Sequence, residues 1–356
     1  MPPVLLTEPY FTALKLLMVL PVLLSTVPVM TWLERRGSAF MQDRLGPNRI
    51  RVFGIQNFGL VQPLADAIKF IFKEDVIPAA ANRALYVMAP GLALVPAITM
   101  FAAIPFAAPV TVDGVRHSFA IADINLGVLA VLAIGSLSVY GVVLGGWASN
   151  NKFSLVGGLR SSAQMLSYEL SMGLAVLAIV MSAGSFRLDD VVGAQGGTFL
   201  GAIPRWNLLP QFLGFLVFLT AAYAETNRTP FDIAEADSEL VAGYHTEYGS
   251  MKFALFFMAE YIHMATASAL LASLYLGGWQ VPYLDVTRLA PIPAFLASAG
   301  AFTLKTLFFL WLYVWVRWTV PRFRYDQLMK LGWKVLLPLS VVNMALVGIL
   351  ITAKVL

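Results

Sequence analysis

Long apolar runs separated by short polar connections dominate the chain. Eight of them approach or exceed the roughly 20 residues that an α-helix needs to cross a bilayer. They cover residues 10–32, 84–107, 122–148, 160–184, 208–225, 249–277, 293–317 and 334–355. Their mixed composition favours helices over the strands of about 10 alternating residues that build an outer-membrane barrel. The pattern predicts an all-α integral membrane protein with about eight transmembrane helices.

The segment Pro63–Lys73 has a different pattern. Gln62, Asp66, Lys69 and Lys73 recur at helical spacing and form one polar stripe, with apolar residues on the remaining surface. Eleven helical residues span only about 16 Å, which is too short to cross a bilayer. We therefore expect a short amphipathic helix on the membrane surface or against a partner. A plain interfacial anchor explains the pattern equally well.

The composition agrees with a membrane protein. Of 356 residues, 59% are hydrophobic and 12% are charged, whereas soluble proteins have roughly 45–50% apolar and about 25% charged residues. The chain has no repeat of the solenoid kind and no inverted half-repeat of the transporter kind. Residues 1–356 are therefore interpreted as a single polytopic membrane domain.

The basic residues predict the orientation. Seventeen of the 24 lysines and arginines lie in the connections after the first, third, fifth and seventh predicted helices. The positive-inside rule places these connections on the cytoplasmic or matrix side and both termini on the outer side. We expect a multi-pass protein of the bacterial inner membrane, with the mitochondrial inner membrane as second choice.

The chain has few residues that could hold a cofactor. It has no cysteine, which excludes an Fe–S cluster, a thiolate zinc site and a disulfide within the chain. The three histidines, His117, His245 and His263, lie far apart in the sequence. No glycine-rich phosphate-binding motif opens a helix. We therefore expect no covalently bound cofactor, no metal site and no redox centre in this chain.

Four ionisable residues interrupt the apolar runs: Glu169, Glu260, His263 and Lys305. Such a residue costs about 2.5–3.5 kcal/mol at the bilayer centre on insertion scales, so it usually faces a polar interior and serves function. Glu260 and His263 share one helix face. A structural role is the alternative, in which a carboxylate pairs with Lys305 or accepts hydrogen bonds from serines and holds helices together.

The connection between the fifth and sixth predicted helices is acidic. It contains one arginine, Arg228, and six carboxylates: Glu225, Asp232, Glu235, Asp237, Glu239 and Glu247. A helix would align three of them, and Asp232 with Glu235 also has the spacing of a helix cap. Closely spaced carboxylates raise one another's pKa, so some could exchange protons near neutral pH. The functional interpretation is a proton relay that leads from this acidic region into the membrane.

A cationic segment follows the first predicted helix. Trp32-Leu33-Glu34-Arg35-Arg36 ends that helix, and Arg49 and Arg51 follow. Basic residues at an inner helix end are commonly anchors to anionic lipid. The carboxylate of Glu34 beside two arginines at the apolar boundary could instead orient the polar head of an amphipathic ligand. Gly141-x-x-x-Gly145 indicates close helix packing.

Several long motifs, in order along most of the chain, resemble the H subunit of bacterial NADH:quinone oxidoreductase (respiratory complex I) and its mitochondrial equivalent. The motifs are Trp32–Arg36, Gln42–Arg49, Leu64–Lys69, Ser167–Glu169, Glu225–Asp232, Glu239–Tyr248, Phe256–Tyr261 and Arg322–Leu328. The resemblance implies a membrane-arm subunit that forms the tunnel by which quinone enters and the first acidic channel toward the proton pumps.

The resemblance assigns two sets of site residues and no catalytic residue. The predicted quinone set is Glu34, Arg35, Arg36, Asp66, Lys69, Arg228, Phe231 and Asp232. The predicted proton channel is Glu169, Glu225, Glu235, Asp237, Glu239, Glu247 and Glu260. The family often has Glu where this chain has Asp237, and the shorter side chain could lengthen a hydrogen bond there.

The implied activity is that of a proton-translocating NADH dehydrogenase of the respiratory chain, with a quinone such as ubiquinone as substrate. FMN and Fe–S clusters are expected only in partner subunits. The implied partners are the peripheral-arm Fe–S and quinone-site subunits, small membrane-arm subunits and membrane lipid, with no nucleic acid. Quinone reduction would change the charge around the acidic connection and drive protons past Glu169 and Glu260.

Three other interpretations remain at this point. The homologous subunit of a membrane-bound hydrogenase or ferredoxin-linked ion pump would share the acidic relay without a quinone. A stand-alone secondary transporter would also explain carboxylates in the membrane, although the missing half-repeats count against it. A purely structural anchor would not need Glu169 and Glu260 in the bilayer.

Overall fold

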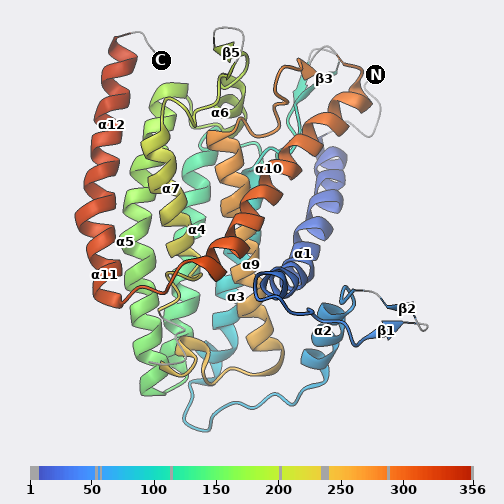
Figure 1. The fold of residues 1–356 in the computed structure, drawn as a ribbon, viewed down its shortest axis with the longest axis vertical. Helices are drawn as coiled ribbons and strands as arrows, with labels where there is room; N and C mark the ends of the chain where they lie inside the picture. The colour runs from blue at the N-terminus through green and yellow to red at the C-terminus, as the bar shows by residue number, and fades with distance from the viewer. Residues whose placement is uncertain are drawn as a thin grey trace.

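The apolar runs fold as long helices that stand side by side in a bundle (Figure 1). The computed structural model describes residues 8–52, 55–56, 58–112, 115–199, 203–233, 240–286 and 289–353. Three predicted channel residues, Glu235, Asp237 and Glu239, lie outside the described residues.

The predicted helices are all present as helices, with shifted ends. They are α1 (Glu8–Met41), α3 (Arg83–Met100, continued by the 3₁₀ turn Phe101–Ala103), α4 (Gly127–Ala148), α5 (Lys152–Ala183), α7 (Phe212–Glu225), α9 (Ser250–Tyr275), α10 (Pro291–Thr319), and a last helix made of α11 (Tyr325–Lys330), the π-helical turn Leu331–Leu336 and α12 (Leu337–Thr352). Within the described ranges, seven helices are long and apolar enough to cross a membrane. The prediction of an all-α membrane protein is confirmed.

The fifth predicted helix is shorter than expected. The sequence predicts it over residues 208–225, whereas α7 has 14 residues, about 21 Å of helix. Residues 207–211 form a turn instead, and Pro210 lacks the N–H that a helix interior needs. The N–H of Leu208 bonds to the carbonyl of Tyr275, 3.0 Å away, so α7 begins beside the end of α9.

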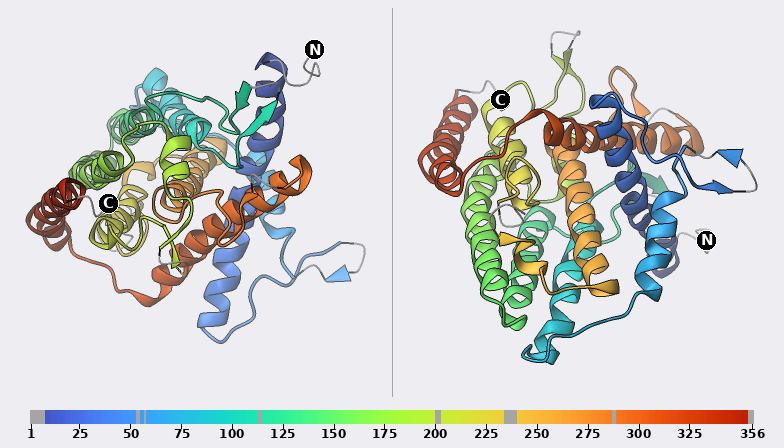
Figure 2. Two further views of the ribbon diagram at one scale, coloured as in Figure 1. Left: turned by 90° about the horizontal axis from the view of Figure 1, so that it is seen from above. Right: turned by 60° about the horizontal axis from the view of Figure 1, so that its bottom comes forward.

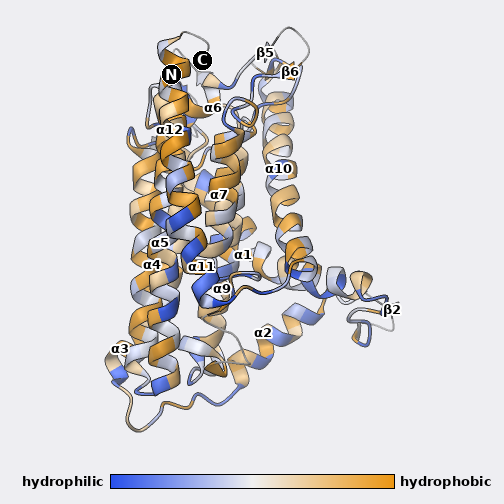
Figure 3. Ribbon diagram, turned by 60° about the vertical axis from the view of Figure 1, so that its left-hand side comes forward, coloured by the Kyte–Doolittle hydropathy of each residue, from blue (hydrophilic) through white to orange (hydrophobic). Residues whose placement is uncertain are grey.

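The connections contain short elements. These are the helices α2 (Gln62–Phe72) and α6 (Leu188–Ala194), the 3₁₀ turn Gly243–His245, and the antiparallel hairpins β1–β2 (Arg51–Val52, Ile55–Gln56), β3–β4 (Val110–Val112, Val115–His117) and β5–β6 (Thr198–Phe199, Ile203–Pro204). The predicted amphipathic helix is therefore confirmed as α2. It lies aslant beside the bundle, near the end opposite β5 and β6, and hydrophilic residues are frequent along it (Figure 3).

The two ends of the bundle differ in their connections. The start of α1 and the end of α12 lie at the same end, together with α6, β3 and β5, and the opposite end carries α2 and the hairpin β1–β2 (Figure 1). Pro21 and Pro28 lie inside α1, where proline bends a helix. The bent helix packs against α2, α9 and α10 (Figure 2).

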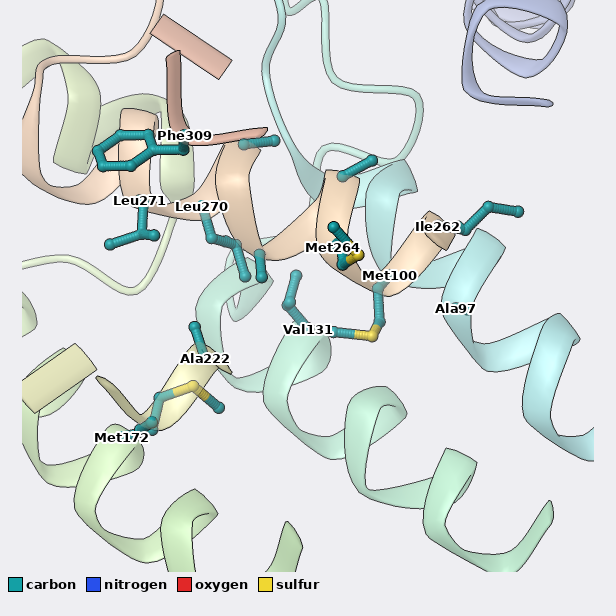
Figure 4. Packing of buried hydrophobic residues seen from close by; sticks show 14 of the residues in the cluster. Ala97, Met100, Val131, Met172, Ala222, Ile262, Met264, Leu270, Leu271 and Phe309 are labelled. Carbon is teal, nitrogen blue, oxygen red and sulfur yellow. The ribbon is translucent and has the colours of Figure 1, made fainter. Parts of the chain in front are cut away.

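Helix α9 lies at the centre of the core. Every residue from Tyr261 to Tyr275 is buried, and its apolar side chains pack among those of neighbouring helices (Figure 4). The predicted close packing at Gly141 is also present. A Cβ atom there would lie 2.5 Å from the backbone nitrogen of Ala93, so only glycine lets α3 and α4 approach this closely.

Candidate functional site: a buried charge cluster

A buried arginine, Arg228, lies at the centre of the site. It follows the end of α7 by three residues and is 6% exposed. It forms ion pairs with Glu260 of α9 (Nε to Oε1, 2.5 Å) and Glu34 of α1 (Nη1 to Oε1, 3.3 Å). Burial lowers the pKa of Arg228, but these carboxylates outweigh that effect and raise its pKa well above the usual range. Because unpaired buried charges are costly, the three residues depend on one another.

Glu34 has two further partners. Arg317, in the last turn of α10, forms an ion pair with it, and the hydroxyl of Tyr261 donates a hydrogen bond to its Oε2. The guanidinium of Arg228 lies 4.4 Å from the ring centroid of Tyr261, within the range of a cation–π contact. We call Glu34, Arg228, Glu260, Tyr261 and Arg317 the charge cluster. Its two cations balance two carboxylates and join α1, α9, α10 and the connection after α7.

Helix α5 holds the connection that carries Arg228. The amide nitrogen of Gln164 donates to the carbonyls of Ala224 (2.7 Å) and Phe231 (2.9 Å) and to Oδ1 of Asn227 (3.2 Å). Asn227 in turn donates to the hydroxyl of Ser161, 2.9 Å away. Because these bonds fix both sides of Arg228, its guanidinium has a defined position between the two carboxylates.

Two residues of the predicted quinone set continue this connection. Asp232 pairs with Arg322 at 3.0 Å, and burial raises the pKa of Asp232 although nearby guanidinium groups oppose the rise. Phe231 is buried and packs edge-to-face on Tyr168, with ring centroids 5.7 Å apart. Phe231 is therefore part of the packed core, whereas Asp232 lies nearer the surface.

The rest of the predicted quinone set lies outside the charge cluster. Arg35 pairs with Asp66 of α2 at 2.6 Å, and Gln62 also donates to that carboxylate. Arg36 lies against two phenylalanine rings, and Lys69 is exposed on α2. The motif at the end of α1 is thus divided, because its carboxylate points into the protein and its two arginines face α2 and the surface.

Glu225 and Glu169 of the predicted channel meet at α4. Ser136 donates a hydrogen bond to Oε1 of Glu169. At the adjacent position, a Cβ atom on Gly135 would lie 3.6 Å from Oε1 of Glu225. The two carboxylates are close enough to interact electrostatically. The structure therefore brings together residues from α5 and α7 that lie far apart in the sequence.

A small cavity lies between Glu225 and the charge cluster. Its volume is about 40 Å³, and Glu225, Glu260 and His263 line it together with residues of α3, α4 and α5. A cavity of this size has room for a water molecule, and the side chains of Glu225, Glu260 and His263 offer it polar partners. Glu260 is thus a member of the charge cluster and also a wall of the cavity.

Glu247 is not among the residues that line this cavity. Its carboxylate accepts a hydrogen bond from Nδ2 of Asn151 at 2.6 Å, and its carbonyl accepts one from the hydroxyl of Tyr86 at 2.7 Å. Asn151 precedes α5, at the end of the bundle that also carries the start of α3 and α9. Glu247 is therefore placed at the end of the predicted channel that faces the α2 side.

Two lysines within apolar helices have structural partners. The ammonium of Lys305 donates to the carbonyls of Leu276 (2.7 Å), Gly278 (2.9 Å) and Gln280 (2.7 Å), just beyond the end of α9. The interpretation that Lys305 pairs with a carboxylate is wrong, because these carbonyls use its three N–H donors. Lys15 of α1 likewise donates to two backbone carbonyls.

Sequence reasoning missed two members of the charge cluster. In the sequence, Arg317 is one of several basic residues at an inner helix end, and Tyr261 is only part of a motif. The position of Arg317 inside the last turn of an apolar helix is the available signal, because a cation there must find a partner or leave the bilayer.

The chemistry of the cluster suits a polar ligand and proton exchange. Guanidinium and phenol groups donate hydrogen bonds to oxygen atoms of a ligand, and carboxylates accept and release protons. Across the described ranges, no three His, Asp or Glu side chains gather so as to hold a metal ion. Fold and site together define a polytopic membrane protein in which one buried guanidinium pairs with carboxylates of two different helices.

Comparison with known proteins identifies the family. The family model described as NADH dehydrogenase matches residues 14–348. The chain belongs to this family, which confirms the resemblance seen in its motifs.

The relatives cover nearly the whole chain. The chain is 47% identical to NADH-quinone oxidoreductase subunit 8 of Rhodothermus marinus, over 96% of this chain and 97% of that protein. It is 47% identical to the H subunit of NADH-quinone oxidoreductase from Salinibacter ruber, over 95% of each chain. It is 49% identical to the H subunit of the same enzyme from Leptospira biflexa, over 91% of this chain and 90% of that protein.

Proposed function

We propose that this chain is the membrane-embedded H subunit of a proton-pumping NADH:quinone oxidoreductase, in which it couples quinone reduction to proton movement. The position of Arg228 carries the proposal. Its guanidinium contacts Glu34, from the predicted quinone set, and Glu260, from the predicted channel. A change in charge at one carboxylate therefore acts on the other through one shared guanidinium.

An apolar cavity beside the charge cluster supports a path for quinone. Its volume is about 300 Å³, and side chains of α1, α9 and α10 line it, among them Thr26, Ala265 and Leu310. The same three helices carry Glu34, Tyr261 and Arg317 roughly one to two helical turns further toward the α2 end. An apolar tail would lie in the cavity while the polar head reaches the charged groups.

Helix α2 would form the mouth of this path. Most of its apolar side chains are exposed, as expected for a helix at the membrane surface. Asp66 holds it to α1 through Arg35, and Lys69 and Arg36 lie near that contact. In this assignment Phe231 and Asp232, which lie in the connection after α7, would form part of the tunnel wall.

The carboxylates would form the proton path. Glu247 lies at the α2 end, Glu225 and Glu260 line the small cavity, and Glu169 meets Glu225 at α4. Glu235, Asp237 and Glu239 would complete the path from the acidic connection. Glu225, Glu169 and Glu260 lie on three different helices, so the proposed path crosses the bundle.

Electrons would come from partner subunits. The chain has no cysteine to hold an Fe–S cluster, so FMN and Fe–S clusters are assigned to peripheral-arm subunits that reduce the quinone. That arm would dock at the end with α2 and β1–β2, with small membrane-arm subunits beside the bundle. Both termini would then face the periplasm in a bacterial inner membrane.

The test uses the whole enzyme in membranes, with Glu34→Gln, Glu260→Gln and the double variant. We expect Glu34→Gln to lower inhibitor-sensitive NADH:quinone reduction and Glu260→Gln to lower the number of protons moved per electron. Because Arg228 links the two, the effects should not add. Asp123→Asn, which removes an ion pair with Arg187 away from the site, is the control.

Two outcomes would contradict the proposal. One is a normal rate and a normal proton-to-electron ratio in both single variants. The other is recovery of the chain as a stable single protein without flavin- or Fe–S-containing partners, which would favour a stand-alone transporter.

A further inference from the structure

A histidine with an unused ring nitrogen lies on the small cavity. His263 is 8% exposed and lines the cavity with Glu225 and Glu260. Its Nε2 atom is buried and has no hydrogen-bond partner among the described residues. A buried polar atom without a hydrogen-bond partner destabilises the folded state, so the presence of a histidine at this position suggests a role other than packing.

The geometry places this imidazole on one cavity with two carboxylates. His263 follows Glu260 by three positions on α9, so both project from one helix face. Glu225 reaches the same cavity from the end of α7. Among the described residues that line the cavity, the imidazole is the only basic side chain. Proton transfer between the carboxylates therefore has an acceptor on the wall that they share.

The other ionisable groups around the cavity define its charge balance. Tyr244 also lines it. Beyond the lining, Arg228 holds Glu260 on the side of the charge cluster, and Glu169 lies near Glu225 on the side of α4. When Glu225 loses its proton, its negative charge lies near the carboxylate of Glu169. When Glu260 gains a proton, it loses the negative charge that pairs with Arg228.

We propose that His263 carries protons between Glu225 and Glu260, an inference that rests on the proposed proton channel. Protonated Glu225 gives its proton to Nε2 of neutral His263, which yields a carboxylate and an imidazolium. The imidazolium then gives a proton to the Glu260 carboxylate and becomes neutral again. One proton moves and no electron is transferred. Water in the cavity bridges any gap between the groups.

The experiment replaces His263 in the whole enzyme and measures proton pumping and NADH:quinone reduction separately across pH. His263→Gln keeps a polar side chain that does not titrate in this range. We expect its coupled pumping rate to fall about tenfold or more, since positioned proton carriers contribute about 10²–10⁴-fold to a step. The matched control is His117→Gln, which removes a second buried histidine far from the cavity.

Chemical rescue separates a proton carrier from a packing residue. His263→Gly removes the ring, and added imidazole should restore part of the pumping rate. Imidazole should not rescue the variant if His263 only fills space, and pumping by His263→Gln would then match the wild type. Either result would overturn the proposal.

The carboxylate variants tell this failure apart from a failure of the proposed function. If Glu225→Gln and Glu260→Gln lose pumping while His263→Gln keeps it, the channel stands and only the role of His263 is wrong. If all three variants pump normally, the proposed channel itself is wrong.

Discussion

The guanidinium of Arg228 and the carboxylate of Glu260 are 2.5 Å apart, although the acidic connection separates the two residues in the sequence. Arg228 also pairs with Glu34, so one cation serves two carboxylates that are both largely buried. The arrangement makes the charge on one carboxylate depend on the other.

The first prediction concerns this shared cation. Arg228→Gln leaves two buried carboxylates with one cation fewer, and breaking a buried pair costs about 3–5 kcal/mol. We expect reduced assembly of the subunit and a lower unfolding temperature of the purified enzyme. The double variant Arg228→Gln/Glu260→Gln restores charge balance and should be more stable than Arg228→Gln alone. A double variant that is no more stable would show that charge balance does not govern this site.

The second prediction concerns pH. Burial raises the pKa of Asp232 in the folded protein despite its pair with Arg322. The stabilising contribution of this group is therefore full below the usual Asp pKa of about 3.9 and is lost as pH rises through the raised folded value. Asp232→Asn should remove that loss from the unfolding temperature measured across pH. A profile for Asp232→Asn that runs parallel to the wild-type profile would contradict the prediction.

The third prediction concerns the end of α9. Lys305→Met removes the donor to three carbonyls, and an unsatisfied buried polar group costs about 1–3 kcal/mol. Thermal unfolding of the purified enzyme should occur at a lower temperature. Lys330→Met, which removes an exposed lysine of α11, should leave it unchanged. An equal effect of the two substitutions would show that the hydrogen bonds of Lys305 to these carbonyls do not stabilise the fold.

The fourth prediction concerns helix packing. Gly141→Ala puts a Cβ atom 2.5 Å from the backbone of Ala93, and overpacking of this kind costs about 1–3 kcal/mol. The variant should unfold at a lower temperature than the wild type. Gly173→Ala in α5 is the matched control, because nothing lies within 4 Å of its added atom. It should be neutral or slightly stabilising, since alanine favours a helix over glycine.

The fifth prediction concerns the contact between α1 and α2. Arg35 and Asp66 are partly exposed, and exposed pairs contribute only about 0.2–1 kcal/mol to stability. Asp66→Asn should therefore leave the unfolding temperature almost unchanged while it raises the KM for quinone, because α2 forms the proposed mouth. Exchange of the two charges, Arg35→Asp/Asp66→Arg, should restore the KM. An unchanged KM in Asp66→Asn would remove α2 from the quinone path.

Helices are more predictable from this sequence than the contacts between them. A long apolar run predicts a membrane-spanning helix because the free energy of placing a segment in a bilayer depends mainly on the composition of that segment. The predicted start of α7 is wrong because residues 207–211, which include Pro210, form a turn although most of them are apolar or proline. The prediction for Pro63–Lys73 is correct because its polar stripe is a local pattern.

Contacts between distant residues are not predictable in this way. Glu34 and Arg317 are separated by 283 positions, and no local pattern relates them. Lys305 could equally pair with a carboxylate as far as the sequence is concerned, and only the fold shows that the carbonyls beyond α9 lie nearer. The resemblance assigns Arg228 to the quinone set and Glu260 to the proton channel. The structure shows that the two side chains pair within one charge cluster.

The burial of α9 limits where conformational change can occur. From Tyr261 to Tyr275 the helix is packed on all sides, and Lys305 fastens the segment beyond its end. We therefore expect this half of α9 to keep its position when the charges nearby change. In the proposed function, rearrangement after a change in charge would then be confined to the half near Ser250 and to the connection that carries Arg228. The helical carboxylates in the described part of the proposed path and in the charge cluster lie on α1, α9, α7 and α5, so the proposed signal would travel across the bundle and not along one helix.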